Sequence, residues 1–216
     1  MAHDTRVEER NQMVEYQIRL RGVSDERVLD AMRKIPRHQF VPESLSAAAY
    51  NDSPLPIGSG QTISQPYIVA LMTELMEVGA NDHILEIGTG SGYQAAILGR
   101  LAASVVSVER IPDVAAGAEK NLDKAGIKNV TVIVSDGTEG YPAGAPYDCI
   151  LITAAAPDIP APLVDQLKDG GRLVAPVGSR DLQILVKLEK HGSAVTRTSH
   201  GGVVFVPLLG RYGWNQ

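Results

Sequence analysis

The sequence predicts an α/β fold built on a doubly wound, mostly parallel β-sheet. Three observations support this prediction. Short apolar strands alternate with helical patterns from residue 83 to residue 178, a glycine-rich turn follows the first of these strands, and the last two strand patterns have no helix between them. Repeated strand–helix units with short connections form parallel sheets covered by helices on both faces. Two strands joined without a helix indicate an antiparallel edge on that sheet.

The first part of the chain is expected to be helical and then irregular. Residues 7–22 carry apolar positions at helical spacing and end in a glycine, and residues 24–35 form a second helix with Ser24 as its N-cap. Residues 36–64 show little periodicity. A connection of that length inside a compact domain is usually functional. Helical spacing returns over residues 65–78.

The rest of the chain supplies the sheet. The expected strands are 83–88, 104–110, 129–136, 147–154, 171–178, 181–192 and 194–209, and the expected helices between them are 92–102, 111–126 and 160–170. At 216 residues, the chain is long enough for one sizeable core. We therefore expect one domain, with N-terminal helices and a loop over 1–80, a βα core over 81–180 and C-terminal strands over 181–216.

Composition limits the partners and the compartment. The net charge of −5 argues against bulk binding to nucleic acid or to an anionic membrane, where basic surfaces supply the attraction. The N-terminus is charged rather than apolar, and no apolar run approaches the ~18 residues of a membrane span. With a single cysteine the chain forms no internal disulfide, which fits a reducing compartment. We expect a cytoplasmic protein, and a monomer because no extended apolar seam is evident.

The cysteine and the histidines give no sign of a reactive or metal centre. Cys149 falls inside an apolar strand, where a cysteine is more often a small buried hydrophobe than a nucleophile. The histidines show no ligand spacing, so no metal is predicted. They are His3, His38, His83, His191 and His200.

The clearest site signal is LEIGTGSGYQAA, residues 85–96, where a strand runs into three closely spaced glycines and a helix. Glycines allow a tight turn and a close approach of the backbone to a ligand, and a helix N-terminus offers free N–H groups. A dinucleotide fingerprint would place a small residue at position 93, which is Tyr93 here. An acid, Glu86, also ends the strand, and a pyrophosphate would be repelled by it. A cationic ligand such as S-adenosylmethionine suits Glu86 better, by direct contact or through water.

Acids at the ends of the next two strands strengthen the interpretation that this Rossmann-like sheet edge binds S-adenosylmethionine. Glu109 ends the second strand, where an acid can accept hydrogen bonds from both hydroxyls of a ribose. Asp136 ends the third strand and precedes Gly137, where the side chain and the backbone can hold an adenine amine. The alternative for each acid is a simple N-cap on the next helix. Three acids on one sheet edge nevertheless favour a shared cofactor site.

The fourth strand indicates which kind of acceptor is methylated. Residues 150–160, ILITAAAPDIP, offer room through three alanines but lack the acid-containing motif that amino-group methyltransferases often place there. A carboxylate has a reference pKa of about 4, so it is already an ionised nucleophile at neutral pH and needs no base. The uncharged hydroxyl-rich stretch 56–67, PIGSGQTISQPY, suits the orientation of such an acceptor.

Four segments together resemble the protein-L-isoaspartate O-methyltransferases, and the resemblance covers nearly the whole chain. They are PIGSGQTISQPY (56–67), ILEIGTGSGYQAA (84–96), YDCILITAAAP (147–157) and GGVVFVPLLGRYGW (201–214). The resemblance implies methyl transfer from S-adenosylmethionine to the α-carboxyl of L-isoaspartyl, and some D-aspartyl, residues of damaged proteins. The resulting methyl ester then collapses to a succinimide that reopens partly to aspartate.

The same resemblance assigns roles to residues of this chain. Ser64 matches the active-site residue within a loop that meets substrate and cofactor. The matched substrate-binding positions are Thr62, Ile63, Ser64, Val206, Pro207 and Leu208. The matched cofactor positions are Glu86, Gly88, Thr89, Gly90, Ser91, Gly92, Glu109, Asp136 and Gly137. Tyr67 departs from many animal members, which carry histidine there.

Other interpretations remain open at this point. Ser64 alone is equally well explained as a helix N-cap. The cofactor acids are compatible with a methyltransferase for a small molecule or for another carboxylate. A non-catalytic cofactor-binding module is a third possibility, and a dinucleotide oxidoreductase is disfavoured by Glu86 and Tyr93.

Overall fold

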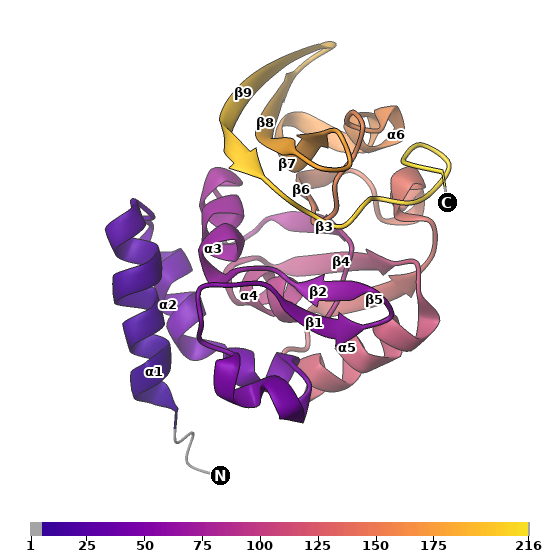
Figure 1. Cartoon of the computed structure of the whole chain (residues 1–216). Coiled ribbons are helices and arrows are strands. Elements are labelled where there is room, and N and C mark those ends of the chain that lie inside the picture. The colour runs from indigo at the N-terminus through magenta and orange to yellow at the C-terminus, as the bar shows by residue number, and fades with distance from the viewer. Residues whose placement is uncertain (1–5, 216) are drawn as a thin grey trace.

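The computed structural model describes residues 6–215, and the N-terminal segment that includes His3 lies outside the described residues. A seven-stranded sheet in the order β5-β4-β3-β6-β7-β8-β9 forms the centre of the molecule (Figure 1). The pairs β5/β4, β4/β3, β3/β6 and β6/β7 are parallel, whereas β7/β8 and β8/β9 are antiparallel. The predicted mostly parallel sheet with an antiparallel C-terminal edge is confirmed.

The strands and the main helices follow the predicted order. The strands are β3 (His83–Ile87), β4 (Ser104–Glu109), β5 (Val130–Val134), β6 (Tyr147–Ile152), β7 (Leu167–Gly178), β8 (Gln183–His191) and β9 (Ala194–Val203). The helices are α3 (Pro66–Leu75), α4 (Tyr93–Leu101), α5 (Pro112–Lys124) and α6 (Ala161–Asp165), with 3-10 turns η5 (Gly137–Glu139) and η6 (Pro142–Gly144) after β5. The central strands β3 and β6 are almost wholly buried, as continuous apolar strands of a parallel sheet should be.

The N-terminal helices differ in detail from the sequence prediction. Helix α1 (Val7–Gln12) continues as a π-helix, η1 (Met13–Ile18), and a 3-10 turn, η2 (Arg19–Arg21), which ends where Gly22 adopts φ +102°. Helix α2 (Glu26–Lys34) is capped by Asp25, whose side chain accepts from the Arg27 N–H, and not by Ser24 as predicted. The N–H groups of Ser24 and Asp25 both donate to Glu74 of α3, at 2.6 and 2.7 Å, which fixes the start of the helix.

Two predictions about the connections were wrong. The irregular stretch 36–64 contains 3-10 turns, η3 (Arg37–Phe40) and η4 (Glu43–Ala48), and an antiparallel hairpin of β1 (Leu55–Gly58) and β2 (Gln61–Ile63). The helix predicted over 160–170 stops at Asp165, because Leu167 already pairs with Tyr147 at the start of β6. The last strand likewise ends at Val203, and the chain from Val204 onward crosses the sheet edge where the parallel strands end.

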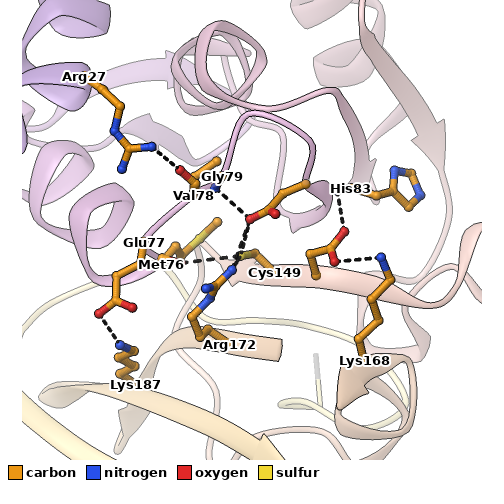
Figure 2. Close-up of polar contacts among 12 residues, drawn as sticks. Arg27, Met76, Glu77, Val78, Gly79, His83, Cys149, Lys168, Arg172 and Lys187 are labelled. Carbon is orange, nitrogen blue, oxygen red and sulfur yellow. Dashed lines mark hydrogen bonds and ion pairs between the residues drawn. The ribbon is translucent and has the colours of Figure 1, made fainter. Parts of the chain in front are cut away.

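The amino edge of the sheet, where the parallel strands begin, carries a network of paired polar groups (Figure 2). Arg172 donates through Nη2 to Asp82 and to the sulfur of Cys149, both at 3.1 Å. Asp148 accepts from Lys168 at 2.7 Å and from the His83 N–H at 2.8 Å. Cys149 is fully buried, and burial raises its pKa to about 12. The prediction that this cysteine is a buried small side chain is confirmed.

Candidate active site

The glycine loop after β3 contains three positions whose backbone conformation favours glycine. Gly88, Gly90 and Gly92 have φ values of +98°, +54° and +84°. A Cβ at Gly88 would overlap the hydroxyl of Thr153, which donates to the Gly88 carbonyl at 2.6 Å from the end of β6. The loop is therefore closely packed against the end of β6 at Gly88.

Glu109 joins the glycine loop to the end of β4. Its carboxylate accepts from the Gly90 N–H and from the Ile111 N–H, both at 3.0 Å. Although only 7% exposed, it lines a hollow at the sheet edge, here called the edge hollow. The lining residues are Gln61, Ile87, Gly88, Val108, Glu109, Arg110, Ile111, Gly137, Ala154, Pro207, Leu208 and Leu209. The structure thus places Glu109 and Gly137 together, as the sequence predicted for a shared ligand.

Glu86 lies beneath the loop rather than beside the hollow. It is fully buried and accepts a hydrogen bond from the Ser107 hydroxyl, while its other oxygen has no partner within the described residues. The Ser107 hydroxyl also shares a hydrogen bond of 2.6 Å with the Thr89 hydroxyl. Burial raises the pKa of Glu86 to about 8; the Ser107 hydrogen bond opposes the shift and the charge of Glu109 adds to it. A direct contact to a bound cation would require this side chain to leave its buried position.

Asp136 uses its carboxylate within the protein. It accepts from the Thr138 N–H at 2.9 Å and from the Arg211 N–H at 2.8 Å, so it both caps η5 and holds the C-terminal segment. Burial acts to raise the pKa of Asp136, but these hydrogen bonds outweigh it and the pKa lies below its usual value. The N-cap alternative considered from the sequence therefore describes the side chain, whereas Gly137 faces the edge hollow.

The β1–β2 hairpin packs over the glycine loop at Gly90. A Cβ on Gly90 would lie 3.7 Å from the Ile57 side chain and 3.9 Å from the Thr62 carbonyl. Between hairpin and loop lies a second cavity, the loop hollow. It is lined by Thr62, Ile63, Ser64, Val69, Gly88, Thr89, Gly90, Ser91, Tyr93, Gln94 and Thr153. Gly88 borders both the edge hollow and the loop hollow, so the two spaces adjoin.

A larger groove of about 490 Å³ opens beside the residues that follow the hairpin turn, Thr62 to Gln65. It is lined by Arg21, Pro54, Thr62, Ser64, Gln65, Tyr67, Ile68, Leu182, Gly202, Val203, Val204 and Phe205. Thr62 and Ser64 border both the groove and the loop hollow. Neither hydroxyl makes a hydrogen bond to any residue between 6 and 215, and the N-cap of α3 is Gln65 rather than Ser64. Two free hydroxyls therefore stand where the two spaces meet.

The C-terminal segment lies differently from the sequence prediction. Val206 and Leu208 pair with Ala155 through backbone hydrogen bonds of 2.8 Å, which fixes the segment against the end of β6. Pro207 and Leu208 face the edge hollow, while the groove is bordered by the preceding residues 202–205. Arg21, Tyr67 and Leu182 also reach the groove. Tyr67 belongs to the 56–67 stretch singled out in the sequence, whereas Arg21 of η2 and Leu182, just before β8, reach the groove through tertiary packing and are marked by no local motif.

The residues present fit S-adenosylmethionine. The hollows combine the side-chain-free backbone of Gly88 and Gly90, an acid at the end of β4, and Gly137, where a Cβ would lie 2.6 Å from Ile87. Among the described residues, no group of three or more histidine, cysteine or acidic side chains is placed to hold a metal ion. The described helices also include none long and apolar enough to cross a membrane. The fold and the edge of the sheet define a class I S-adenosylmethionine-dependent methyltransferase.

Comparison with known proteins identifies the family. The family model for protein-L-isoaspartate(D-aspartate) O-methyltransferase matches residues 8–213, and the chain belongs to this family. A protein-L-isoaspartate O-methyltransferase of Methanoculleus marisnigri is 64% identical over 206 residues, 95% of this chain and 94% of the relative. One from Syntrophobacter fumaroxidans is 57% identical over 95% of this chain and 96% of its own length.

Solved structures agree with this placement. A protein-L-isoaspartate O-methyltransferase superposes with a TM-score of 0.84 at 31% identity, covering 94% of this chain and 67% of that one. A Plasmodium falciparum protein solved in complex with S-adenosyl-L-homocysteine superposes with a TM-score of 0.81 over 93% of this chain and 98% of its own. Its identity of 24% shows that the fold is shared.

Proposed function

We propose that this chain repairs damaged proteins by methylating the free α-carboxylate of L-isoaspartyl, and to some extent D-aspartyl, residues with S-adenosylmethionine as donor. The methyl ester then converts through a succinimide to aspartate, and S-adenosyl-L-homocysteine is the second product. The observation that carries the proposal is the position of Thr62 and Ser64. Their free hydroxyls border both the loop hollow and the groove, where donor and acceptor would have to meet.

The chain's own residues would hold the donor at the carboxyl edge of the sheet. When bound, S-adenosylmethionine supplies an electrophilic methyl group on a sulfonium. The backbone around Gly88, Thr89, Gly90, Ser91 and Gly92 would cradle its amino-acid part, and Glu109 would accept hydrogen bonds from its ribose. Gly137 would border the adenine, with Asp136 fixing that turn. Glu86 would act from below, by holding Ser107 and Thr89 in place.

The acceptor needs orientation more than activation. An isoaspartyl α-carboxylate is ionised at pH 7, since the reference pKa is about 4. Of the described residues that line the loop hollow and the groove, none is an acid. The Ser64 hydroxyl would donate a hydrogen bond to one carboxylate oxygen of the acceptor. The other carboxylate oxygen would then attack the methyl group in line. Positioning of this kind supplies a large share of the rate enhancement, because the reaction becomes effectively unimolecular.

The wider setting follows from the same proposal. The chain acts as one methyltransferase domain, in which residues 1–80 supply the helices and substrate loop, 81–180 bind the cofactor and 181–216 close the substrate groove. Its partners are isoaspartyl-containing proteins and peptides, with no nucleic acid and no membrane. It works as a monomer in the cytoplasm, consistent with its net charge of −5 and its single cysteine.

The test is methyl transfer to two peptides of identical sequence that contain either isoaspartate or aspartate. We expect transfer from labelled S-adenosylmethionine to the isoaspartyl peptide alone. Equal labelling of both peptides, or labelling of neither, would refute the proposal. The first result would favour a broader carboxyl methyltransferase and the second, with cofactor still bound, a binding module.

Ser64→Ala tests the role of the hydroxyl. Losing one hydrogen bond to a charged group should cost roughly 1.5–3 kcal/mol in kcat/KM while leaving S-adenosylmethionine binding nearly unchanged. Ser193→Ala, an exposed serine between β8 and β9, is the matched control and should behave as the native chain does. Native turnover by Ser64→Ala would remove Ser64 from the mechanism.

A further inference from the structure

The groove beside Ser64 has one charged side chain among its described lining residues. Of the described residues lining it, Arg21 alone is charged, and the others are hydroxyl, amide, aromatic, glycine or aliphatic residues. Arg21 comes from η2 at the end of the first helix, far in sequence from the hairpin and from the C-terminal segment that form the rest of the lining. The position of this charge is therefore a property of the tertiary fold and not of a loop motif.

The Arg21 guanidinium is held in a defined orientation. It lies over the ring of Tyr67 at 3.6 Å from the ring centroid, and its Nη1 donates to Asp52 at 2.8 Å. The Asp52 carbonyl in turn accepts from the Gln65 amide at 3.1 Å, one residue after Ser64. A stacked and paired guanidinium loses little further freedom when it meets an acceptor. Arg21 is thus fixed relative to the stretch that carries Ser64.

Part of the guanidinium remains available. Its Nε and Nη2 make no hydrogen bond to any described residue, and the side chain is 42% exposed. Guanidinium N–H groups arranged as a fork match a carboxylate well. Asp52 engages a single nitrogen of the guanidinium and leaves the other N–H donors unused. The groove therefore presents a partly compensated cation with free donors.

The carboxylate that undergoes methylation is not the group that Arg21 meets. That carboxylate must reach the loop hollow, which Thr62 and Ser64 border and Arg21 does not. An isoaspartyl residue has one free carboxylate, so a second anionic group must come from a neighbouring residue of the peptide. We propose that Arg21 is a specificity-determining residue that favours substrates with an acidic side chain next to the isoaspartate and disfavours those with a lysine there. This assignment rests on the proposed function.

The test compares three isoaspartyl peptides that differ at the residue beside the isoaspartate, which is glutamate, alanine or lysine. The peptides are acetylated and amidated so that no terminal charge contributes, and each substitution is made once before and once after the isoaspartate. The native chain should show a kcat/KM about fivefold higher for glutamate than for lysine on one of the two sides, the size expected for a partly exposed ion pair. The ratio should shrink in about 1 M salt, where the screening length is about 3 Å.

Two variants move the ratio in opposite directions. Arg21→Gln should bring the glutamate-to-lysine ratio close to one. Asp52→Asn should raise it above the native ratio, because the guanidinium then lacks its counter-ion. Lys128→Gln is the matched control: it removes the same charge from an exposed pair with Asp123 near the start of β5 and should leave the native ratio intact.

The outcomes separate the two proposals. A native ratio of one, or an unchanged ratio in Arg21→Gln, overturns the Arg21 assignment while methylation of the alanine peptide still supports the repair function. Absence of transfer to the alanine peptide by the native chain overturns the repair function, and with it this assignment.

Discussion

The two edges of the sheet differ in how many of their polar side chains have hydrogen-bond partners within the protein. At the amino edge, Asp82 accepts from Arg172 and Asp148 accepts from Lys168 and from the backbone of β3 (Figure 2). Each of these carboxylates is satisfied by the protein itself. Such pairs fix the starts of the strands, and the one unpaired polar atom found among the described residues of this network is the buried Nε of Arg172.

The carboxyl edge keeps polar groups without internal partners. The hydroxyls of Thr62 and Ser64 are free within residues 6–215, and one oxygen of the buried Glu86 is unpaired. Most buried polar groups in folded proteins are hydrogen-bonded, so the unpaired oxygen of Glu86 calls for an explanation. Thr62 is exposed and Ser64 is half-buried, so their hydroxyls are open to solvent or to a ligand. The difference teaches that this fold closes one edge with ion pairs and leaves the other to be completed by donor and substrate.

The largest expected effect comes from the same glycine substitution at the two edges. Gly88→Ala combines a φ of +98° with overlap of Thr153, and should lower the free energy of unfolding by about 2–5 kcal/mol. Gly170→Ala, at φ +74° near the start of β7, has open space around its Cβ and should cost about 1–2 kcal/mol. Urea denaturation measures both values. Equal losses would show that contact with Thr153 does not shape the loop.

Glu86 provides the next largest effect, as a dependence of stability on pH. Burial raises the pKa of Glu86 to about 8 from 4.5, so the folded protein holds this proton more tightly than the unfolded chain does. Its contribution to stability is complete below about pH 4.5 and is lost as the pH rises through about 8. Within that window the free energy of unfolding should fall by up to about 1.4 kcal/mol per pH unit.

Glu86→Gln is the variant that isolates this titration. A glutamine keeps the shape of the side chain and carries no charge, so the slope between about pH 5 and pH 8 should flatten. Urea midpoints across that range measure the slope. An unchanged slope in the variant would show that another group titrates.

Glu109→Gln should weaken cofactor binding. The carboxylate accepts from the Gly90 and Ile111 N–H groups, and the neutral amide replaces one acceptor oxygen with a donor. Loss of hydrogen bonds to a charged group predicts a roughly 10- to 100-fold higher Kd for S-adenosyl-L-homocysteine by calorimetry. The rate at saturating cofactor should change less than the affinity does. Asp82→Asn at the amino edge is the control, and it should leave the Kd unaltered.

The smallest expected effect belongs to Asp148→Asn. Burial acts to raise the pKa of Asp148, but hydrogen bonds from the His83 N–H and Lys168 outweigh it and the pKa lies below 3.8. The carboxylate therefore stabilises the fold above about pH 4, and this contribution is lost as the pH falls through the lowered pKa. The variant should lose about 1 kcal/mol at pH 7 and approach the native chain as the pH falls through the lowered pKa. A loss that is independent of pH would assign it to packing instead.

The regular part of the fold was predictable because its signals are local. Each strand of the parallel core is an apolar run, β3, β4, β5 and β7 end at or near a glycine or an acid, and each helix has its own spacing and stop. The β1–β2 hairpin gave no such signal, because it is short, contains Pro56 and two glycines, and gains its place by packing Ile57 over Gly90. The start of β7 was likewise decided by pairing with β6 rather than by its own helical spacing.

The site was predictable in composition but not in orientation. The acids at the strand ends were found because chain order and sheet order coincide there. Which way each carboxylate points depends on partners distant in sequence: Asp136 turns to Arg211, Glu86 to Ser107 and Glu109 to the glycine loop. Arg21 was missed for the same reason, since its contact with Tyr67 joins the end of η2 to the start of α3, 46 residues further along the chain.

The β1–β2 hairpin has a consequence for equilibrium binding. It forms a wall of the loop hollow, and residues at its end also border the groove, so any displacement of the hairpin that one ligand favours is transmitted to the other. Thermodynamic linkage then requires reciprocity: the factor by which the methyl donor alters peptide affinity equals the factor by which the peptide alters donor affinity. Cooperativity between the two ligands is therefore measurable from either side of this one structural element.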